Sequence, residues 1–241
     1  MVNKLLTDKT NWATSGLIQG RGLLRATSIM GFSVKEIYFT LQGEGAQTGR
    51  AAVFCRFSGC NLWTGRDQDR HKASCTFCDT DFVGTDGPGG GKFADEDSLV
   101  RAVLAAWPQA SANTQPYVVF TGGEPLLQLT PALIAACKQA GIEVAIETNG
   151  TLPAPDRIDW ICVSPKPGRG MKQTAGDELK LVFPQPECPP TDFEHLNFTH
   201  FFLQPMDGPD QQLNIQRAAE YCQAHPQWRL SLQTHKLIGL P

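Results

Sequence analysis

Three cysteines in the first third of the chain have types and a spacing suited to metal chemistry. Cys60, Cys75 and Cys78 form the pattern C-x14-C-x2-C, and Asp79 follows directly. Clusters that only transfer electrons normally have four cysteine ligands. Three thiolates on a [4Fe-4S] cluster leave one iron without a protein ligand, and that iron can chelate the amino and carboxylate groups of S-adenosylmethionine (SAM). The pattern therefore predicts a cluster that binds SAM.

A structural zinc site is the alternative interpretation of these cysteines. Cys55 and Cys60 form a C-x4-C pair, which could complete a four-thiolate site with Cys75 and Cys78. Strand alternation argues against this site, because Cys55 lies inside the apolar run AAVFCRF while Cys60 lies beyond its end. The remaining cysteines sit singly in apolar or proline-rich stretches and are expected to be packing residues: Cys137, Cys162, Cys188 and Cys222.

A second motif, GGEP, follows the predicted strand in YVVFTGGEPLLQ. Gly122 and Gly123 let the backbone approach a ligand closely, and the carboxylate of Glu124 can accept hydrogen bonds from an ammonium group. A tight turn explains a lone GGEP equally well, but this one shares a strand-end rim with the cysteine loop. Active sites gather at that rim in α/β barrels. Other strand ends add polar residues to it: Glu147, Thr148, Asn149, Ser164, Lys166, Gln204 and Asp207.

The elements that must position these residues alternate between strands and helices. Strands are expected over 34–39, 51–57, 117–120, 142–147, 159–164, 178–183, 200–205 and 229–234. Helices are expected over roughly 95–107 and 211–224, and a third has Thr130 as N-cap, Pro131 as first residue and Gly141 just past its end.

The alternation implies parallel βαβ units. The link from Glu147 to Ile158 is short and contains two prolines, so a crossover helix there is expected to be shrunken or absent. The fold class predicted is therefore α/β, an open, partial (β/α) barrel with reduced helix content instead of a complete eightfold barrel.

Composition sets the broad class of protein. A chain of 241 residues that is 41% hydrophobic can bury one sizeable core. A net charge of -3 gives no field that would attract nucleic acid or an anionic membrane, so a small-molecule substrate is expected. No apolar run of membrane-spanning length and no signal peptide is found, which predicts a cytoplasmic protein. Residues 1–30 show no sustained period and are expected to be an extension, disordered or derived from cloning, before a single domain over 31–241.

At this point the motifs resemble a known family. The three-cysteine loop with GGEP resembles the radical SAM superfamily. A fuller set resembles the 7-carboxy-7-deazaguanine synthases from about Val34 to Pro241: FTLQGEGAQTGRAAVFCRFSGCNLW, CTFCDTDF, FTGGEPLLQ, AIETNG, CVSPK, LQPMDG and LSLQTHK. The spacing departs from the common C-x3-C-x2-C of the superfamily, but expanded loops occur within the synthases.

The resemblance implies a carbon-nitrogen lyase that converts 6-carboxy-5,6,7,8-tetrahydropterin to 7-carboxy-7-deazaguanine with loss of ammonia, a step towards queuosine. The reduced [4Fe-4S] cluster would donate an electron to SAM, giving methionine and a 5′-deoxyadenosyl radical that abstracts hydrogen from substrate C6. The ring would then contract, SAM would be regenerated and Mg²⁺ would assist. The resemblance also implies a homodimer and a flavodoxin-like or other electron donor.

The resemblance further implies roles for single residues. Cys60, Cys75 and Cys78 would hold the cluster, and Thr80 would hold Mg²⁺, which prefers hard oxygen donors. SAM would contact Phe77, Cys78, Asp79, Gly122, Gly123, Glu124, Ser164, Pro165, Lys166, Gln204, Pro205, Met206 and Asp207. The substrate would contact Leu41, Gln42, Gly43, Arg56, Thr121, Glu147, His235 and Pro241.

The residue pattern around Arg56 agrees with its expected role. An arginine in an apolar strand is costly to bury unpaired, and its guanidinium fork suits a carboxylate such as that of the substrate. An arginine whose head reaches solvent is the alternative. Two other classes of protein stay open: a glycyl-radical activating enzyme, which the CDTDF and LQGEG motifs do not support, and a zinc-stabilised binding module without catalysis.

Overall fold

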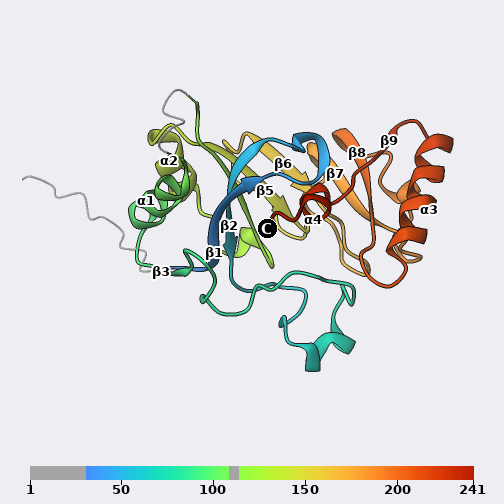
Figure 1. Cartoon of the computed structure of the whole chain (residues 1–241), viewed down its shortest axis with the longest axis horizontal. Coiled ribbons are helices and arrows are strands. Elements are labelled where there is room, and N and C mark those ends of the chain that lie inside the picture. The colour runs from blue at the N-terminus through green and yellow to red at the C-terminus, as the bar shows by residue number, and fades with distance from the viewer. Residues whose placement is uncertain (1–30, 109–113) are drawn as a thin grey trace, which may run out of the picture.

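The computed structural model describes residues 31–108 and 114–241, so the extension expected at 1–30 lies outside the described residues. The described chain forms one nine-stranded sheet with the order β3-β1-β2-β4-β5-β6-β7-β8-β9. The strands are β1 Phe32–Leu41, β2 Ala51–Phe57, β3 Gly91–Phe93, β4 Tyr117–Gly122, β5 Glu143–Thr148, β6 Trp160–Val163, β7 Ala175–Phe183, β8 Asn197–Pro205 and β9 Trp228–Leu230. The predicted open, partial barrel is confirmed (Figure 1).

The start of the sheet differs from the expected series of parallel units. Strand β1 pairs antiparallel with both β2 and β3, and every pair from β2 to β9 is parallel. Residues 42–50 are too few for the crossover that a parallel pair needs, so β2 turns back against β1. Strand β3 is absent from the predicted strands, because its glycine-rich sequence has low strand propensity. It forms by pairing with the exposed edge of β1.

Three helices cover the outer face of the sheet, close to where the sequence predicts them. Helix α1, Glu96–Ala106, starts with a capping box between Asp95 and Ser98, and α2, Pro131–Gln139, is capped by Thr130. Figure 1 shows α1 and α2 beside the first strands and α3, Gln211–Ala224, beside β8 and β9. The links 149–159, 164–174 and 184–196 contain no α-helix, which confirms the reduced helix content.

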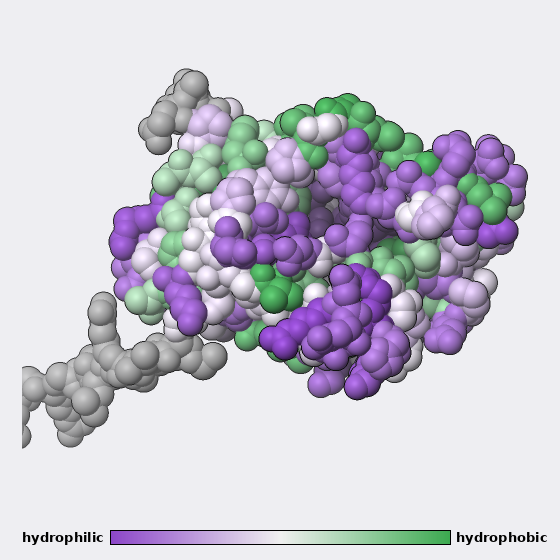
Figure 2. Space-filling model, turned by 60° about the horizontal axis from the view of Figure 1, so that its bottom comes forward, coloured by the Kyte–Doolittle hydropathy of each residue, from purple (hydrophilic) through white to green (hydrophobic). Residues whose placement is uncertain are grey.

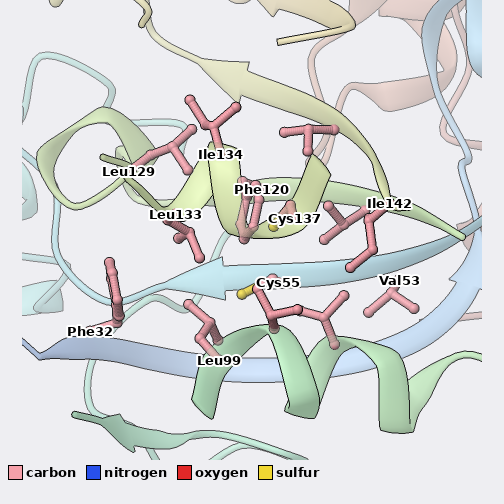
Figure 3. Packing of buried hydrophobic residues seen from close by; sticks show 14 of the residues in the cluster. Phe32, Val53, Cys55, Leu99, Phe120, Leu129, Leu133, Ile134, Cys137 and Ile142 are labelled. Carbon is pink, nitrogen blue, oxygen red and sulfur yellow. The ribbon is translucent and has the colours of Figure 1, made fainter. Parts of the chain in front are cut away.

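The core between α1, α2 and the sheet is entirely apolar. Figure 3 shows Cys55, Leu99, Phe120 and Leu133 pointing toward one another between the strands and the helices. Cys55 is fully buried in this cluster. A second outer cluster lies under α3 and contains Trp228 and Cys188. The described cysteines are all free thiols, and Cys137 and Cys188 pack as apolar residues as expected.

The inner face of the sheet has an apolar layer below a polar one. Successive strand residues alternate between faces, so the inward positions of β2 are Ala52, Phe54 and Arg56. The apolar layer is made by Ala52, Phe54, Tyr117, Val119 and Ala145. The next inward position towards the carboxyl end of each strand carries a polar residue: Arg56, Thr121 and Glu147. The alternation therefore sets these side chains above a closed floor.

The two ends of the sheet do not pair, and the end of the chain bridges the gap between them. The sequence predicts strand over 229–234, but β9 stops at Leu230 and helix α4, Thr234–Ile238, follows. The backbone N–H of Thr234 donates to Gly43 O at 3.0 Å, and that of Gly45 donates to Ser231 Oγ at 2.9 Å. Figure 1 shows α4 lying across the middle of the curved sheet. In the described residues, no helix is long and apolar enough to cross a membrane.

Candidate active site

The carboxyl ends of the strands surround a cavity of about 510 Å³. Figure 2 shows this part of the surface hollowed between hydrophilic residues. All but three of the residues predicted for the site line it: Leu41, Gln42, Gly43, Arg56, Cys60, Cys75, Phe77, Cys78, Asp79, Thr80, Thr121, Gly122, Gly123, Glu147, Ser164, Lys166, Gln204, Pro205, Asp207, His235 and Pro241. Glu124, Pro165 and Met206 do not line this cavity, and Pro165 lines a smaller one beside it.

The loop with the three cysteines folds into a small cluster of its own. Cys60, Cys75 and Cys78 pack with Trp63 and Phe82 at one side of the cavity. Burial raises the pKa of Cys60, against a hydrogen bond that the backbone N–H of Leu62 donates to Cys60 Sγ at 3.4 Å.

Residues inserted between Cys60 and Cys75 hold this loop in place. Arg70 lies in the short 3-10 helix Asp67–Lys72 and donates from Nη1 to Thr76 O at 3.0 Å and Cys78 O at 2.9 Å. Its guanidinium also lies 4.7 Å from the centre of the Trp63 ring. The long spacing of the motif is therefore accounted for by a segment that folds back onto the C-x2-C turn.

The donor set fits an iron-sulfur cluster better than zinc. Cys55 belongs to the apolar core under α1 and α2, on the strand face opposite Arg56, so a four-thiolate site with the other three is not formed. Three soft thiols remain on the cavity, which suits a cluster with one open iron. Burial raises the pKa of Cys75 to about 11, so metal binding must displace its proton. Within residues 31–108 and 114–241, no three His, Cys, Asp or Glu side chains are already arranged as a ligand set.

The two glycines of GGEP allow the loop after β4 to lie against the cysteine loop. Gly122 has φ of 146°, and a Cβ there would lie 2.3 Å from Phe57 O. A Cβ on Gly123 would lie 2.3 Å from Gly59 O and 2.6 Å from Cys60 Cβ. A side chain at Gly123 would therefore push Cys60 away, and one at Gly122 would push against the end of β2. The close approach expected of the glycines is to the cysteine loop itself.

Glu124 differs from the expectation that its carboxylate would meet SAM. It is fully buried and accepts hydrogen bonds from Leu126 N at 2.9 Å, Thr148 Oγ1 at 2.8 Å and Asn149 N at 2.8 Å. Burial raises the pKa of Glu124 and outweighs these hydrogen bonds, which act to lower it. The carboxylate joins the loop after β4 to the end of β5, so this structure makes it a brace behind the cavity.

Residues on the side expected to bind SAM have donors available. Lys166 Nζ donates to Ser164 Oγ at 2.6 Å. Gln204 accepts from Ser231 Oγ at 2.8 Å, and its buried Nε2 finds no partner in the described part of the chain. A buried donor without a partner is costly, so a ligand that accepts from it would relieve the cost.

Sequence reasoning missed Lys236, which ties two of the expected SAM residues together. Its Nζ donates to Asp79 Oδ2 at 2.7 Å and to Asp207 Oδ2 at 2.5 Å. Partial burial acts to lower the pKa of Lys236, but the two carboxylates outweigh it and the pKa is raised. Helix α4 therefore reaches both the cysteine loop and the end of β8. A lysine directly after the expected His235 was the available signal.

The opposite side of the cavity holds the residues expected to bind substrate. Arg56 Nε donates to Glu36 Oε1 at 2.8 Å, and its Nη1 has no hydrogen-bond partner among the residues described. His235 lies against Gly43, because a Cβ on that glycine would come within 2.0 Å of His235 Nδ1. Thr40 Oγ1 donates to Pro241 O at 3.3 Å, which brings Pro241 to the cavity edge.

A buried charged group below this side was also missed. Lys180 forms ion pairs with Glu44 and Glu147, and the buried Glu178 lies on the other side of Cys162 from Glu147. Cys162 belongs here too and not to an apolar core, because it pairs in register with Glu147 and Glu178. The signal was a lysine in the apolar run ELKLVF, comparable to Arg56 in AAVFCRF.

The chain is similar to known proteins over most of its length. A family model described as the Radical SAM superfamily matches residues 71–162. The chain is 65% identical to the 7-carboxy-7-deazaguanine synthase of Bordetella pertussis and 62% identical to that of Caulobacter vibrioides, each time over 88% of this chain and 100% of the relative. The crystal structure of QueE from Escherichia coli is 25% identical with a TM-score of 0.61, covering 86% of this chain and 95% of that one.

Proposed function

The chain belongs to the 7-carboxy-7-deazaguanine synthases, and we propose that the two sides of its cavity divide the work of that activity. It is a radical SAM enzyme that converts 6-carboxy-5,6,7,8-tetrahydropterin to 7-carboxy-7-deazaguanine with loss of ammonia in queuosine biosynthesis. Relatives of this similarity overturn the activating-enzyme and zinc-module alternatives.

One observation supports the assignment of residues: three thiols and a guanidinium with a free Nη1 line one and the same cavity. Cys60, Cys75 and Cys78 would hold the [4Fe-4S] cluster, which supplies the electron that cleaves bound SAM. Most of the residues expected to contact SAM line the same cavity as the thiols, which supports this assignment. Gln204 Nε2 and Lys166 Nζ would donate to SAM, while Gly123 keeps Cys60 close to the loop after β4.

Arg56 and Glu147 would orient the substrate between them. The free Nη1 of Arg56 suits the substrate carboxylate in a charge-assisted hydrogen bond. Glu147 and Gln42, joined by a 3.0 Å hydrogen bond, would face the polar edge of the ring. The apolar layer below them closes the cavity floor, and α4 covers part of the opening, so both would limit the access of water to a reactive intermediate.

We further propose a Mg²⁺ site at Thr80. Its Oγ1 lies 3.4 Å from Asp79 Oδ1, and both residues line the cavity that the three thiols and Arg56 also line. A hydroxyl oxygen beside a carboxylate suits a hard cation that retains several waters. The ion would neutralise negative charge on the substrate while the ring rearranges.

The location, the assembly and the electron donor are also proposals. We infer a homodimer and a flavodoxin-like donor from the likeness to the synthases. A cytoplasmic location is supported by the cysteines, which are free thiols and include the three expected to hold a reduced cluster.

The activity is tested by anaerobic reconstitution. The protein is loaded with iron and sulfide, mixed with SAM, a reductant and the carboxypterin, and assayed by mass spectrometry for the deazaguanine. We expect product from the wild type and none from Cys75→Ala. Cys137→Ala, which alters a buried cysteine of the outer core, is the matched control and should keep activity. A colourless protein with one zinc and no product would contradict the function.

A further inference from the structure

A buried lysine lies below the substrate side of the cavity. Lys180 lies on β7 with its side chain on the inner face of the sheet, and only 6% of that side chain is exposed. Its Nζ contacts a carboxylate oxygen of Glu44 and lies 3.5 Å from Glu147 Oε1. Glu178, two residues earlier on the same strand face, is buried beside it. One ammonium thus contacts two carboxylates, and a third carboxylate is buried on the same strand face.

Stability gives little reason for such an arrangement. Burying an ion pair costs desolvation that its attraction often fails to repay, and apolar residues of the same volume are frequently as stable. The neighbouring inward positions of the lower layer are apolar, so the fold itself tolerates such residues on this face. The charged group is therefore retained for what it does in the cavity.

The three carboxylates differ in whether an oxygen is left without a hydrogen-bond partner and faces the cavity. Both oxygens of Glu44 are used, one by Lys180 and the other by Gln233 Nε2 at 2.9 Å. Glu178 accepts from Ala46 N at 2.8 Å and does not line the cavity. Glu147 Oε1 is held by Gln42 and Lys180, whereas its Oε2 has no hydrogen-bond partner within the described chain. Glu147 alone presents a free oxygen to the cavity.

We propose that Lys180 is a positioning residue for the pterin ring. It fixes the carboxylate of Glu147 so that Oε2 accepts from the donor edge of the ring, where a 2-amino group adjoins a ring N–H. Arg56 holds the substrate carboxylate at the other end. The inference rests on the proposed function, and it assigns to Lys180 the selection of a 2-amino ring over a 2-oxo ring.

The charges of the surrounding groups agree with this role. Burial acts to raise the pKa of Glu44, but Lys180 outweighs it and the pKa is lowered. Burial likewise acts to lower the pKa of Lys180, and Glu147 and Glu44 raise it well above its ordinary value. The other titratable groups facing these two are Cys162, Glu178 and His235. Without Lys180, Gln233 and His235 are left to offset the burial of Glu44, so the pKa of Glu44 rises.

The test compares Lys180→Met with the wild type in the reconstituted holoenzyme with SAM bound. Anaerobic calorimetry measures the affinity for the carboxypterin and for its analogue with a 2-oxo group. We expect the wild type to prefer the 2-amino ring by at least about tenfold, the value of one charge-assisted hydrogen bond. Lys180→Met should lose most of this preference. Its carboxypterin affinity should fall further as the pH is lowered, because Lys180 no longer holds down the pKa of Glu44, and Lys180→Arg should restore part of both effects.

Arg50→Met is the matched control. Arg50 pairs with Glu143 at 2.5 Å and stacks on the Tyr117 ring of the apolar layer, but neither Arg50 nor Glu143 lines the cavity, so its loss removes a partly buried cation away from the polar residues of the site. Arg50→Met should keep the wild-type preference for the 2-amino ring and the wild-type pH dependence of carboxypterin affinity. If Lys180→Met does not fold, as judged by thermal unfolding and SAM affinity, Lys180→Gln replaces it, since its amide can donate to one carboxylate without the charge.

The outcomes separate this inference from the proposed function. A folded Lys180→Met or Lys180→Gln that keeps the preference for the 2-amino ring and a flat pH profile overturns the positioning role, even if the wild type makes product. A wild type that makes no deazaguanine overturns the function instead. A variant that loses SAM affinity together with carboxypterin affinity shows that Lys180 only maintains the fold, which also overturns the inference.

Discussion

Replacing Glu124 tests whether this buried carboxylate is a brace or a SAM ligand. In Glu124→Gln, one oxygen becomes an amide NH₂. If that group replaces Oε2, it faces the backbone N–H of Asn149, so two donors meet and neither is satisfied. A buried donor without an acceptor costs about 1–3 kcal/mol, which in a protein of this size lowers the melting temperature by roughly 2–12 °C.

Glu124→Ala should cost more, because two backbone donors, Leu126 N and Asn149 N, then lose their acceptor. The sum is roughly 2–6 kcal/mol. Thr148 suffers less, since its hydroxyl can rotate and already accepts from Gly150 N. Thermal unfolding by circular dichroism gives the stability, and anaerobic calorimetry gives the SAM affinity of the reconstituted protein.

The two roles of Glu124 give opposite results. A brace predicts that Glu124→Gln lowers the melting temperature while SAM affinity falls by less than about tenfold, the value of a direct charge-assisted bond. Glu143→Gln, at a half-buried carboxylate paired with Arg50 outside the cavity, is the control and should cost less than about 1 kcal/mol. An unchanged melting temperature with a large loss of SAM affinity would refute the brace.

Three further predictions concern the two sides of the cavity. Cys55→Ala should keep its iron while Cys75→Ala loses it, measured by iron analysis; the reverse result would contradict the ligand assignment. Thr80→Val, nearly isosteric but without the hydroxyl, should lose Mg²⁺ stimulation and keep SAM affinity, and unchanged stimulation would place the ion elsewhere. A tag added after Pro241 should keep SAM affinity but weaken carboxypterin affinity by at least about tenfold, whereas a tag before Met1 should not; equal affinities would show that Pro241 takes no part.

Most of the fold could be predicted because its signals are local. The run AAVFCRF became β2 with the expected bounds, and Thr130 caps its helix as expected. The antiparallel start could also have been predicted, since residues 42–50 cannot form a crossover. Strand β3 could not, because glycine-rich segments become strands only when an exposed edge such as β1 offers hydrogen bonds.

The site residues that motifs mark could also be predicted, whereas the roles that depend on contacts between distant segments could not. Motifs predict residues that follow strand ends, and these line the cavity. Glu124 was assigned a ligand role because the sequence cannot show that Thr148 and Asn149, a strand away, already occupy its oxygens. Lys180 was overlooked although its sequence context matches that of Arg56. A lysine inside an apolar strand indicates a buried, paired charge just as an arginine does, because burying either cation without a partner costs free energy of desolvation.

The unpaired ends of the sheet have a consequence for how this scaffold can change. In a closed barrel, the radius is set by the number of strands and their stagger, so the interior cannot widen without altering every ladder. Here the gap between β1 and β9 is spanned by Gly43, Gly45 and the segment containing Ser231 and Thr234, through individual hydrogen bonds. Lengthening or shortening these two segments would change the width of the cavity and leave every strand pair intact. Substrate size in such a scaffold can therefore diverge through its closing segments while the cysteine loop and its supporting strands stay fixed.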